Sequence, residues 1–209
     1  MDLRDLGAHL PDRLARIQDF LIACDAFKRI ERRNYLADGS RLENDAEHTW
    51  HMALYAVLLH GELAEDVDLG RVLSMILVHD LVEIHAGDTF AYDEAGRADQ
   101  AEREEDAARR LFGRLPADLA ARIDGLWREF EAGETAEARF ARQLDRLQAF
   151  AQNIASDGKA HRQNGVTRSK TRGRMAETLD GDPTLARLAE ALYAHADARG
   201  LWLPEEGEA

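Results

Sequence analysis

An adjacent histidine and aspartate, His79 and Asp80, stand inside an apolar stretch, VLSMILVHDLVEIHAGDT. Buried charge without a partner is costly, so this pair requires a compensating ion or a hydrogen-bond network. Neighbouring residues on a helix point about 100° apart, so both side chains reach one ion only if it lies off the helix, between them. A metal ion that also takes ligands from neighbouring helices would satisfy the pair.

Two further residues are candidates to complete such a site. His48 belongs to another apolar segment upstream, and Asp145 lies downstream in ARQLDRLQAF. Around Asp145, the helical spacing places Ala138, Ala141 and Ala149 on the same face, where small side chains permit close approach. The sequence therefore favours a metal site of two histidines and two aspartates drawn from three helices.

Each of these residues also has a purely structural interpretation. A buried histidine can be a hydrogen-bonded core residue, and Asp145 can pair with Arg142 or Arg146 on the helix surface. Cys24 is the single cysteine, which excludes an internal disulfide and a cysteine-based zinc site. Any metal must be held by histidines and carboxylates, a mixture that leaves Co²⁺, Mn²⁺, Zn²⁺, Fe²⁺ and Mg²⁺ all possible.

Helical patterns recur along almost the whole chain, whereas strand patterns and hairpin-turn signals are weak. The periodicity predicts an all-α fold, with helices over residues 11–31, 44–63, 70–86, 97–113, 116–131, 135–157 and 184–199. Asn44 and Glu47 have the spacing of a capping box at the start of the second helix. The charged segment 97–110 is expected to be a solvated face, and the polar segment 158–183 a long loop or a broken helix.

The helix over 44–63 is expected to be central and buried, because apolar residues follow two of its faces. One stripe contains Ala46, Trp50, Ala53, Leu54, Val57 and Leu58, and the other contains His48, Met52, Tyr55 and Leu59.

The composition is that of an ordinary globular protein of 209 residues, 45% hydrophobic and 32% charged. We expect a single domain over residues 1–203, with its core at about 15–157, and a disordered tail over 204–209. A formal net charge of −13 disfavours a nucleic-acid polymer as partner. The chain shows neither a membrane-spanning run nor a signal-peptide pattern, so we expect a cytoplasmic protein without a membrane partner.

The order of His48, the His79-Asp80 pair and Asp145 resembles the signature of the HD-domain metal-dependent phosphohydrolases. Over about residues 15–155 the chain is similar to the 5′-deoxynucleotidase branch of that family, on the segments AEHTW (46–50), HDLVEIHAGD (79–88) and AEARFARQLDRLQAF (136–150). The resemblance implies an HD-domain helical bundle around one divalent ion, and a homodimer that hydrolyses nucleoside 5′-monophosphates to nucleoside and phosphate. It also favours activity with Co²⁺ or Mn²⁺.

The same resemblance assigns roles to single residues. It implies that the metal is held by His48, His79, Asp80 and Asp145. Glu83 and Asp88 match the catalytic acidic pair of the family, beside the water and the sugar-phosphate ester. Carboxylates near a metal site can orient water or protonate a leaving oxygen.

The family binds the substrate phosphate through an arginine and an aromatic residue shortly before the first histidine. The matching stretch is KRIERRNY, residues 28–35, in which Arg32 is the expected phosphate ligand and Arg33 the competing alignment. Tyr35 stands where related sequences have tryptophan, which leaves the choice of sugar or base open. Both arginines can equally be ordinary surface charges. The basic residues of 159–174 either rim a substrate entrance or belong to a solvated loop.

Two other functions stay open at the sequence level. An HD-type site can act on a different small phosphoester, such as a deoxynucleoside triphosphate or an alarmone. The protein can also be a non-catalytic nucleotide-binding protein that keeps a structural metal. Glu83 and Asp88 argue against the second alternative, because a structural site has no need of an extra acidic pair.

Overall fold

A computed structural model describes residues 9–205. Within them the chain is helical apart from one hairpin, so the all-α prediction is confirmed. The longer α-helices are α1 (Asp12–Cys24), α2 (Asp45–Leu59), α3 (Leu69–Val78), α6 (Gln100–Phe112), α7 (Ala117–Ala132), α8 (Ala136–Ala155) and α12 (Pro183–Ala198). The shorter elements are η2 (Asp25–Arg29), β1 (Glu31–Tyr35), β2 (Leu42–Asn44), η3 (His60–Glu62), α4 (Glu83–Ala86), α5 (Glu94–Arg97), α9 (Lys159–Gln163), α10 (Arg168–Arg174) and α11 (Ala176–Leu179).

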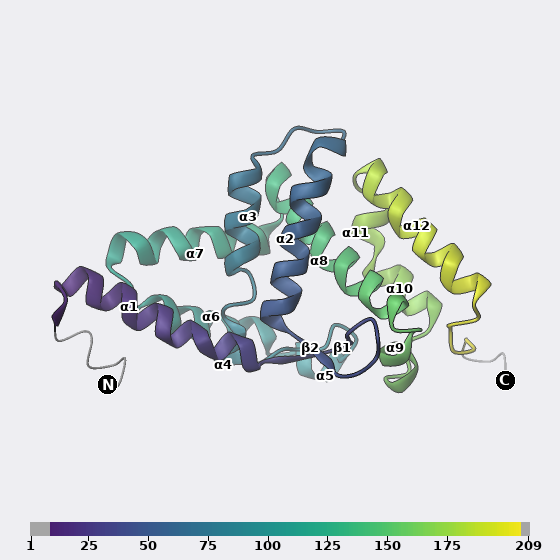
Figure 1. The fold of residues 1–209 in the computed structure, drawn as a ribbon, viewed down its shortest axis with the longest axis horizontal. Coiled ribbons are helices and arrows are strands. Elements are labelled where there is room, and N and C mark those ends of the chain that lie inside the picture. Colours follow the sequence, from purple (N-terminus) through teal and green to yellow (C-terminus); the bar gives the residue numbers. More distant parts are fainter. Residues whose placement is uncertain (1–8, 206–209) are drawn as a thin grey trace.

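The central element is α8, which packs against α2, α3, α7 and α12 (Figure 1). Small residues make this packing close, since Ala138 and Ala141 are completely buried beside Leu144 and Leu147. A second apolar cluster lies around Phe112 and Trp127, where α1, α6 and α7 meet the end of α3. The metal-site candidates lie between these two clusters, on α2, α8 and the segment after α3.

The start of α2 follows the prediction. The Asn44 side chain accepts a hydrogen bond from the Glu47 N–H at 3.0 Å, and Glu47 accepts one from the Asn44 N–H at 3.1 Å. This capping box satisfies two backbone donors that a helix N-terminus otherwise leaves unpaired. The first turn of α2 is therefore fixed, one turn before His48.

The predicted burial of this helix is correct for only one of its two apolar faces. Met52 and His48 of the second stripe are completely buried. On the first stripe, Trp50, Leu54 and Leu58 are 66%, 41% and 67% exposed. The two stripes cover most of the helix circumference, and α3 and α8 cover only one side of it within the described chain.

The helix predicted over 70–86 is interrupted after Val78. The His79 ring nitrogen Nδ1 lies 2.7 Å from the Ile76 carbonyl oxygen, the acceptor that a continuing helix would use for the Asp80 N–H. The chain passes through tight turns before α4 begins at Glu83. His79 and Asp80 lie at this break, and both side chains face the same site.

The helix predicted over 11–31 also ends early, and a hairpin that the sequence does not signal follows it. Strands β1 and β2 pair antiparallel, with Glu31 opposite Asn44 and Tyr35 opposite Leu42. Gly39 has a φ of +69° in the connecting loop, a value that favours glycine. The strand residues ERRNY are mostly polar, so they lack the alternation that identifies a strand.

The polar segment 158–183 folds as the short helices α9, α10 and α11, which agrees with the broken-helix alternative. Residues 1–8 of the expected domain and residues 206–209 of the expected tail lie outside the described residues. Glu205, at the start of that tail, accepts hydrogen bonds from the Ser169 N–H and hydroxyl at 2.9 and 2.6 Å. None of the helices between residues 9 and 205 has the length and apolar character needed to cross a membrane.

Candidate metal centre

The four residues singled out from the sequence meet at one point. His48 Nε2 lies 3.2 Å from Asp145 Oδ1, and His79 Nε2 lies 3.0 Å from Asp80 Oδ2. The distance between His48 Nε2 and Asp80 Oδ2 is 3.8 Å. These residues come from α2, α8 and the turn after α3, so the site joins the three parts of the chain that the spacing predicted.

The hydrogen bonds of the two histidines leave one nitrogen of each ring free for a metal. His48 Nδ1 lies 2.5 Å from the Gln148 side-chain oxygen and His79 Nδ1 lies 2.7 Å from the Ile76 carbonyl, so both Nδ1 atoms must be donors. Both Nε2 atoms are buried and have no hydrogen-bond partner among the described residues. Each Nε2 faces a carboxylate oxygen, so either a proton or a metal ion must lie between the nitrogen and that oxygen, and the residues present fit a divalent ion.

The ionised carboxylates of the site give it negative charge, which favours a bound cation. Burial lowers the pKa of His79, but Asp80 and Asp145 raise it more, to about 9. Burial raises the pKa of Asp80, whereas His79 and Arg32 lower it below its usual range as the stronger effect. Asp145 likewise has a lowered pKa, despite its burial, through His48 and Arg174. Both aspartates are therefore ionised and available as ligands.

A second acidic group adjoins the first. One oxygen from each of Asp45, Asp80 and Glu83 lies within 4.8 Å of the others, and Asp45 is completely buried. Burial and Asp80 raise the pKa of Asp45 to about 6. Burial, Asp80 and Asp45 raise the pKa of Glu83 well above its ordinary value. The site thus combines ionised carboxylates with carboxyls whose pKa values are raised.

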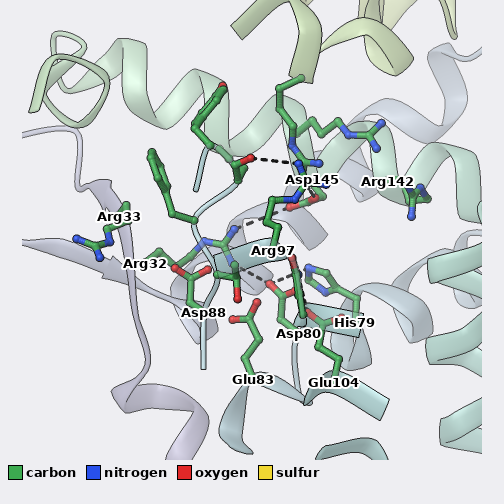
Figure 2. A pocket seen from close by; sticks show the side chains of 18 of the residues that line it. Arg32, Arg33, His79, Asp80, Glu83, Asp88, Arg97, Glu104, Arg142 and Asp145 are labelled. Atoms are coloured by element: carbon green, nitrogen blue, oxygen red, sulfur yellow. Dashed lines mark hydrogen bonds and ion pairs between the residues drawn. The ribbon is translucent and has the colours of Figure 1, made fainter. Parts of the chain in front are cut away.

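Arg32 reaches into these carboxylates from β1. Its Nη1 donates to Asp80 Oδ2 at 2.8 Å and to Asp45 Oδ1 at 3.2 Å, and its Nη2 lies 4.0 Å from Asp145 Oδ1. Figure 2 shows Asp80, Glu83 and Asp88 around this guanidinium. Burial and Asp80 raise the pKa of Asp88, although Arg32 opposes the shift.

The other two candidates from the KRIERRNY segment, Arg33 and Tyr35, lie away from the carboxylates of this centre. Arg33 is exposed on β1 and directed away from the carboxylates (Figure 2), although it also belongs to the lining of the cavity. Tyr35 does not line the cavity; its ring lies under Lys159 Nζ at 3.7 Å from the ring centre. Asn34, between them, does line it.

The centre opens into a cavity of about 620 Å³. Its lining includes charged residues that sequence reasoning did not assign to the site, namely Arg97, Glu104, Glu131, Arg142, Arg146 and Arg174. Glu104 belongs to the segment expected to be a solvated face. Arg142 and Arg146 flank Asp145 in the sequence, and Asp45 precedes His48 by three residues, so helical spacing was a signal for these three. Arg174 belongs to the basic segment 159–174, for which a substrate entrance was one of the two alternatives.

Comparisons with known proteins agree with this geometry. A model of the HD domain family matches residues 24–185. A crystal structure described as a predicted metal-dependent phosphohydrolase from Magnetospirillum magnetotacticum is 48% identical, with a TM-score of 0.87, and the match covers 92% of this chain and 96% of that one. A conserved hypothetical protein from Pyrococcus furiosus, 19% identical with a TM-score of 0.56 over 86% of this chain and 98% of its own, shares the fold.

Among curated proteins, the chain is similar to the 5′-deoxynucleotidase HDDC2 of Bos taurus, at 31% identity over 134 residues. The matched region is 64% of this chain and 64% of the bovine protein, so it spans less than two thirds of that relative. The corresponding protein of Dictyostelium discoideum is 26% identical over 149 residues, which are 68% of this chain and 78% of that protein.

Proposed function

The chain belongs to the HD domain family, and from that premise we propose that it hydrolyses nucleoside 5′-monophosphates, with deoxyribonucleotides preferred, to nucleoside and phosphate. The observation that carries the proposal is the pair of buried histidines whose free Nε2 atoms face Asp80 and Asp145 beside an arginine in an open cavity. This arrangement can hold a cation and a phosphate side by side.

In this proposal His48, His79, Asp80 and Asp145 hold one divalent metal. When bound, the metal supplies positive charge to a phosphoryl oxygen and makes water more acidic. Two imidazoles and two carboxylates accept Co²⁺, Mn²⁺, Zn²⁺ or Fe²⁺ more readily than Mg²⁺, which prefers oxygen ligands throughout. The names of the relatives do not decide among them.

Glu83 and Asp88 are the proposed acid–base groups. Because burial, Asp80 and Asp45 raise the pKa of Glu83, this carboxyl is suited to hold a proton and to donate it to the 5′-oxygen as the nucleoside leaves. Asp88, also in the cavity, is the proposed acceptor that orients the attacking water or the sugar. The two roles require both carboxyls to lie next to the phosphate, at the same end of the cavity as Arg32.

Arg32 is the proposed phosphate ligand. Its guanidinium already lies within hydrogen-bond distance of Asp80, so a phosphate at the metal centre would meet its donors directly. Arg33 is directed away from the carboxylates, and Tyr35 contacts Lys159 rather than the cavity, so neither is proposed to touch the phosphate.

We also propose that the protein is a homodimer that pairs through α2. The exposed residues Trp50, Leu54, Val57 and Leu58 share one face of this helix, and Leu77 of the adjoining α3 is 59% exposed. A contiguous apolar face of this kind marks an association surface. Analytical ultracentrifugation of Trp50→Glu should give monomers if α2 forms the interface, whereas an unchanged dimer would place it elsewhere.

Phosphate release from a panel of nucleotides tests the proposed activity. Metal-stripped protein is resupplied with Co²⁺, Mn²⁺, Mg²⁺ or Zn²⁺ and given 5′-ribo- and 5′-deoxyribonucleotides, with 3′-nucleotides and triphosphates as controls. Release confined to 5′-monophosphates supports the proposal, and the ratio of deoxy to ribo rates tests the sugar preference. Protein that binds a metal but releases no phosphate from any monophosphate would contradict it.

A further inference from the structure

Three arginines line the cavity on the far side of Asp145 from His48. Arg142 and Arg146 come from α8, on either side of Asp145 in the sequence, and Arg174 comes from α10. Arg174 Nη2 lies 3.6 Å from Asp145 Oδ2, whereas Asp145 Oδ1 faces His48 Nε2. Figure 2 shows Arg142 beyond Asp145, on the opposite side from Arg32. We refer to Arg142, Arg146 and Arg174 as the arginine cluster.

Two carboxylates form ion pairs with the arginine cluster, and Glu131 adds a negative charge near Arg142. Glu177 of α11 accepts from both Arg142 Nε, at 3.4 Å, and Arg146 Nη1. The ion-pair partner of Arg174 is Asp145, whose charge is already required by the metal centre. Arg142 also donates to the carbonyl oxygens of Phe130 and Glu131, so the incompletely paired members are Arg146, which shares Glu177, and Arg174, whose partner would also bind a metal.

The positive charge of Arg146 is buried. Its side chain is 9% exposed, and its Nε–H has no acceptor within the described part of the chain. Burial lowers the pKa of Arg146, and the neighbouring charges of Arg174 and Arg142 also lower it, against the effect of Glu177. Buried like charges with an unpaired donor are unfavourable unless an anion joins them. The cluster is thus suited to bind an anion that enters the cavity.

We propose that the arginine cluster is a second anion subsite, which binds a second phosphate group of a nucleotide whose first phosphate lies at the metal centre. The inference rests on the proposed function and extends it: a nucleotide with a second phosphate, either a 5′-diphosphate or a 3′,5′-bisphosphate, should bind more tightly than a 5′-monophosphate. A single reacting phosphate does not account for the cluster, because Arg32 already offers a guanidinium on the other side of the centre. Because the protein has a net charge of −13, it repels a polyanion overall, so attracting one requires local positive charge such as that of the arginine cluster.

Titration calorimetry on the metal-loaded full-length protein tests the subsite without requiring turnover. Three deoxyadenosine analogues share a non-hydrolysable 5′-phosphonate. The first has no other phosphate, the second has a further phosphate joined through a methylene bridge, and the third has a 3′-phosphate. At least one of the doubly charged analogues should bind about tenfold or more tightly than the first, because each charge-assisted hydrogen bond to arginine is strong. Which analogue gains affinity distinguishes the diphosphate from the bisphosphate.

Arg174→Gln is the decisive variant, since Arg174 is partly exposed and its loss should not disturb folding, which circular dichroism checks. It should abolish the gain, measured in the same variant as the ratio of the dissociation constants of the singly and doubly charged analogues, because any effect of the lost Asp145 contact on the metal centre changes both constants. Arg172→Gln is the matched control, because Arg172 lies on the same helix but pairs with Glu190 outside the cavity.

Two results would overturn the subsite. In one, the wild-type protein binds the singly charged analogue and gains nothing from a second phosphate, which leaves the proposed function intact. In the other, Arg174→Gln weakens all three analogues by the same factor, as expected if the cluster contacts the reacting phosphate itself. Failure of even the singly charged analogue to bind would contradict the proposed function as well.

Discussion

Gln148 and His48 form a buried hydrogen bond between α8 and α2, with 2.5 Å between the Gln148 oxygen Oε1 and the histidine nitrogen Nδ1. The orientation of this amide is fixed, because its Nε2 donates to Glu43 Oε1 at 3.0 Å and lies 3.2 Å from His51 Nδ1. His48 must therefore carry its proton on Nδ1. The lone pair on Nε2 is held toward Asp145, in the state that a metal ligand needs.

Replacing Gln148 by leucine should weaken metal binding about 10- to 100-fold, the usual cost of losing the group that orients a ligating histidine. Isothermal titration of the stripped protein with Co²⁺ or Mn²⁺ measures the change. Gln143→Leu is the control, because Gln143 is equally buried on α8 but accepts from the Asp182 N–H, away from the centre. Equal affinities for the wild type and Gln148→Leu would show that Gln148 does not orient the ligand.

Arg32 and Arg33 are adjacent in sequence, yet substitutions at these two positions should have very different effects. Arg32→Gln removes the guanidinium beside Asp80 and should reduce kcat/KM for a 5′-monophosphate about 100-fold or more, as loss of a charged contact to a phosphoryl group does. Arg33→Gln should change it less than about threefold, because Arg33 lies on the exposed side of β1. Steady-state kinetics on both variants decide the alignment. A larger loss at Arg33 would reverse the assignment.

The sequence was sufficient to predict the elements whose signals are local. The capping box of Asn44 and Glu47 and the long amphipathic α8 follow from neighbouring residues alone. The break after Val78 does not, because no glycine or proline marks it; it depends on the His79 ring taking the Ile76 carbonyl. The hairpin that carries Arg32 was missed because its strand residues are polar.

In the candidate site, too, the residues that could be predicted are those with a local signal in the sequence. His48, His79, Asp80 and Asp145 could be selected because their residue types are unusual in apolar segments. Gln148 was not selected, because a buried glutamine on a helix has many ordinary explanations. Arg174 enters from α10, and the sequence left open whether the basic residues there rim a substrate entrance or are solvated, because only the fold brings one of them to Asp145. Residues that complete a site from a distant segment carry no local pattern.

His161 should make the stability of the protein depend on pH. It lies among the rings of Tyr92, Phe150 and Trp202, and burial lowers its pKa to about 4 from an ordinary 6.5. The unfolded chain binds a proton below pH 6.5 while the folded one does not until about pH 4. The stabilisation is therefore complete above pH 6.5 and is lost as the pH falls toward 4, by up to about 3 kcal/mol.

Urea denaturation of the wild type and His161→Gln between pH 7.5 and 4 isolates this contribution, because the carboxylates titrate in both proteins. The free energy of unfolding of the wild type should fall more steeply below pH 6.5, and the two curves should be parallel above it. Parallel curves over the whole range would mean that His161 is protonated in the folded protein as readily as in the unfolded chain.

Glu83→Gln provides the sharpest test of the proton donor. The amide keeps the shape of the carboxyl but cannot donate a proton to the leaving 5′-oxygen. The kcat for a 5′-monophosphate should therefore fall about 10²- to 10⁴-fold. The loss should be much smaller with p-nitrophenyl phosphate, because nitrophenolate leaves without protonation. Asp88→Asn is the comparison, since a group that orients water is needed whatever the leaving group, and its defect should persist on both substrates. Equal losses for Glu83→Gln on the two substrates would show that Glu83 acts on water or on the metal rather than on the leaving oxygen.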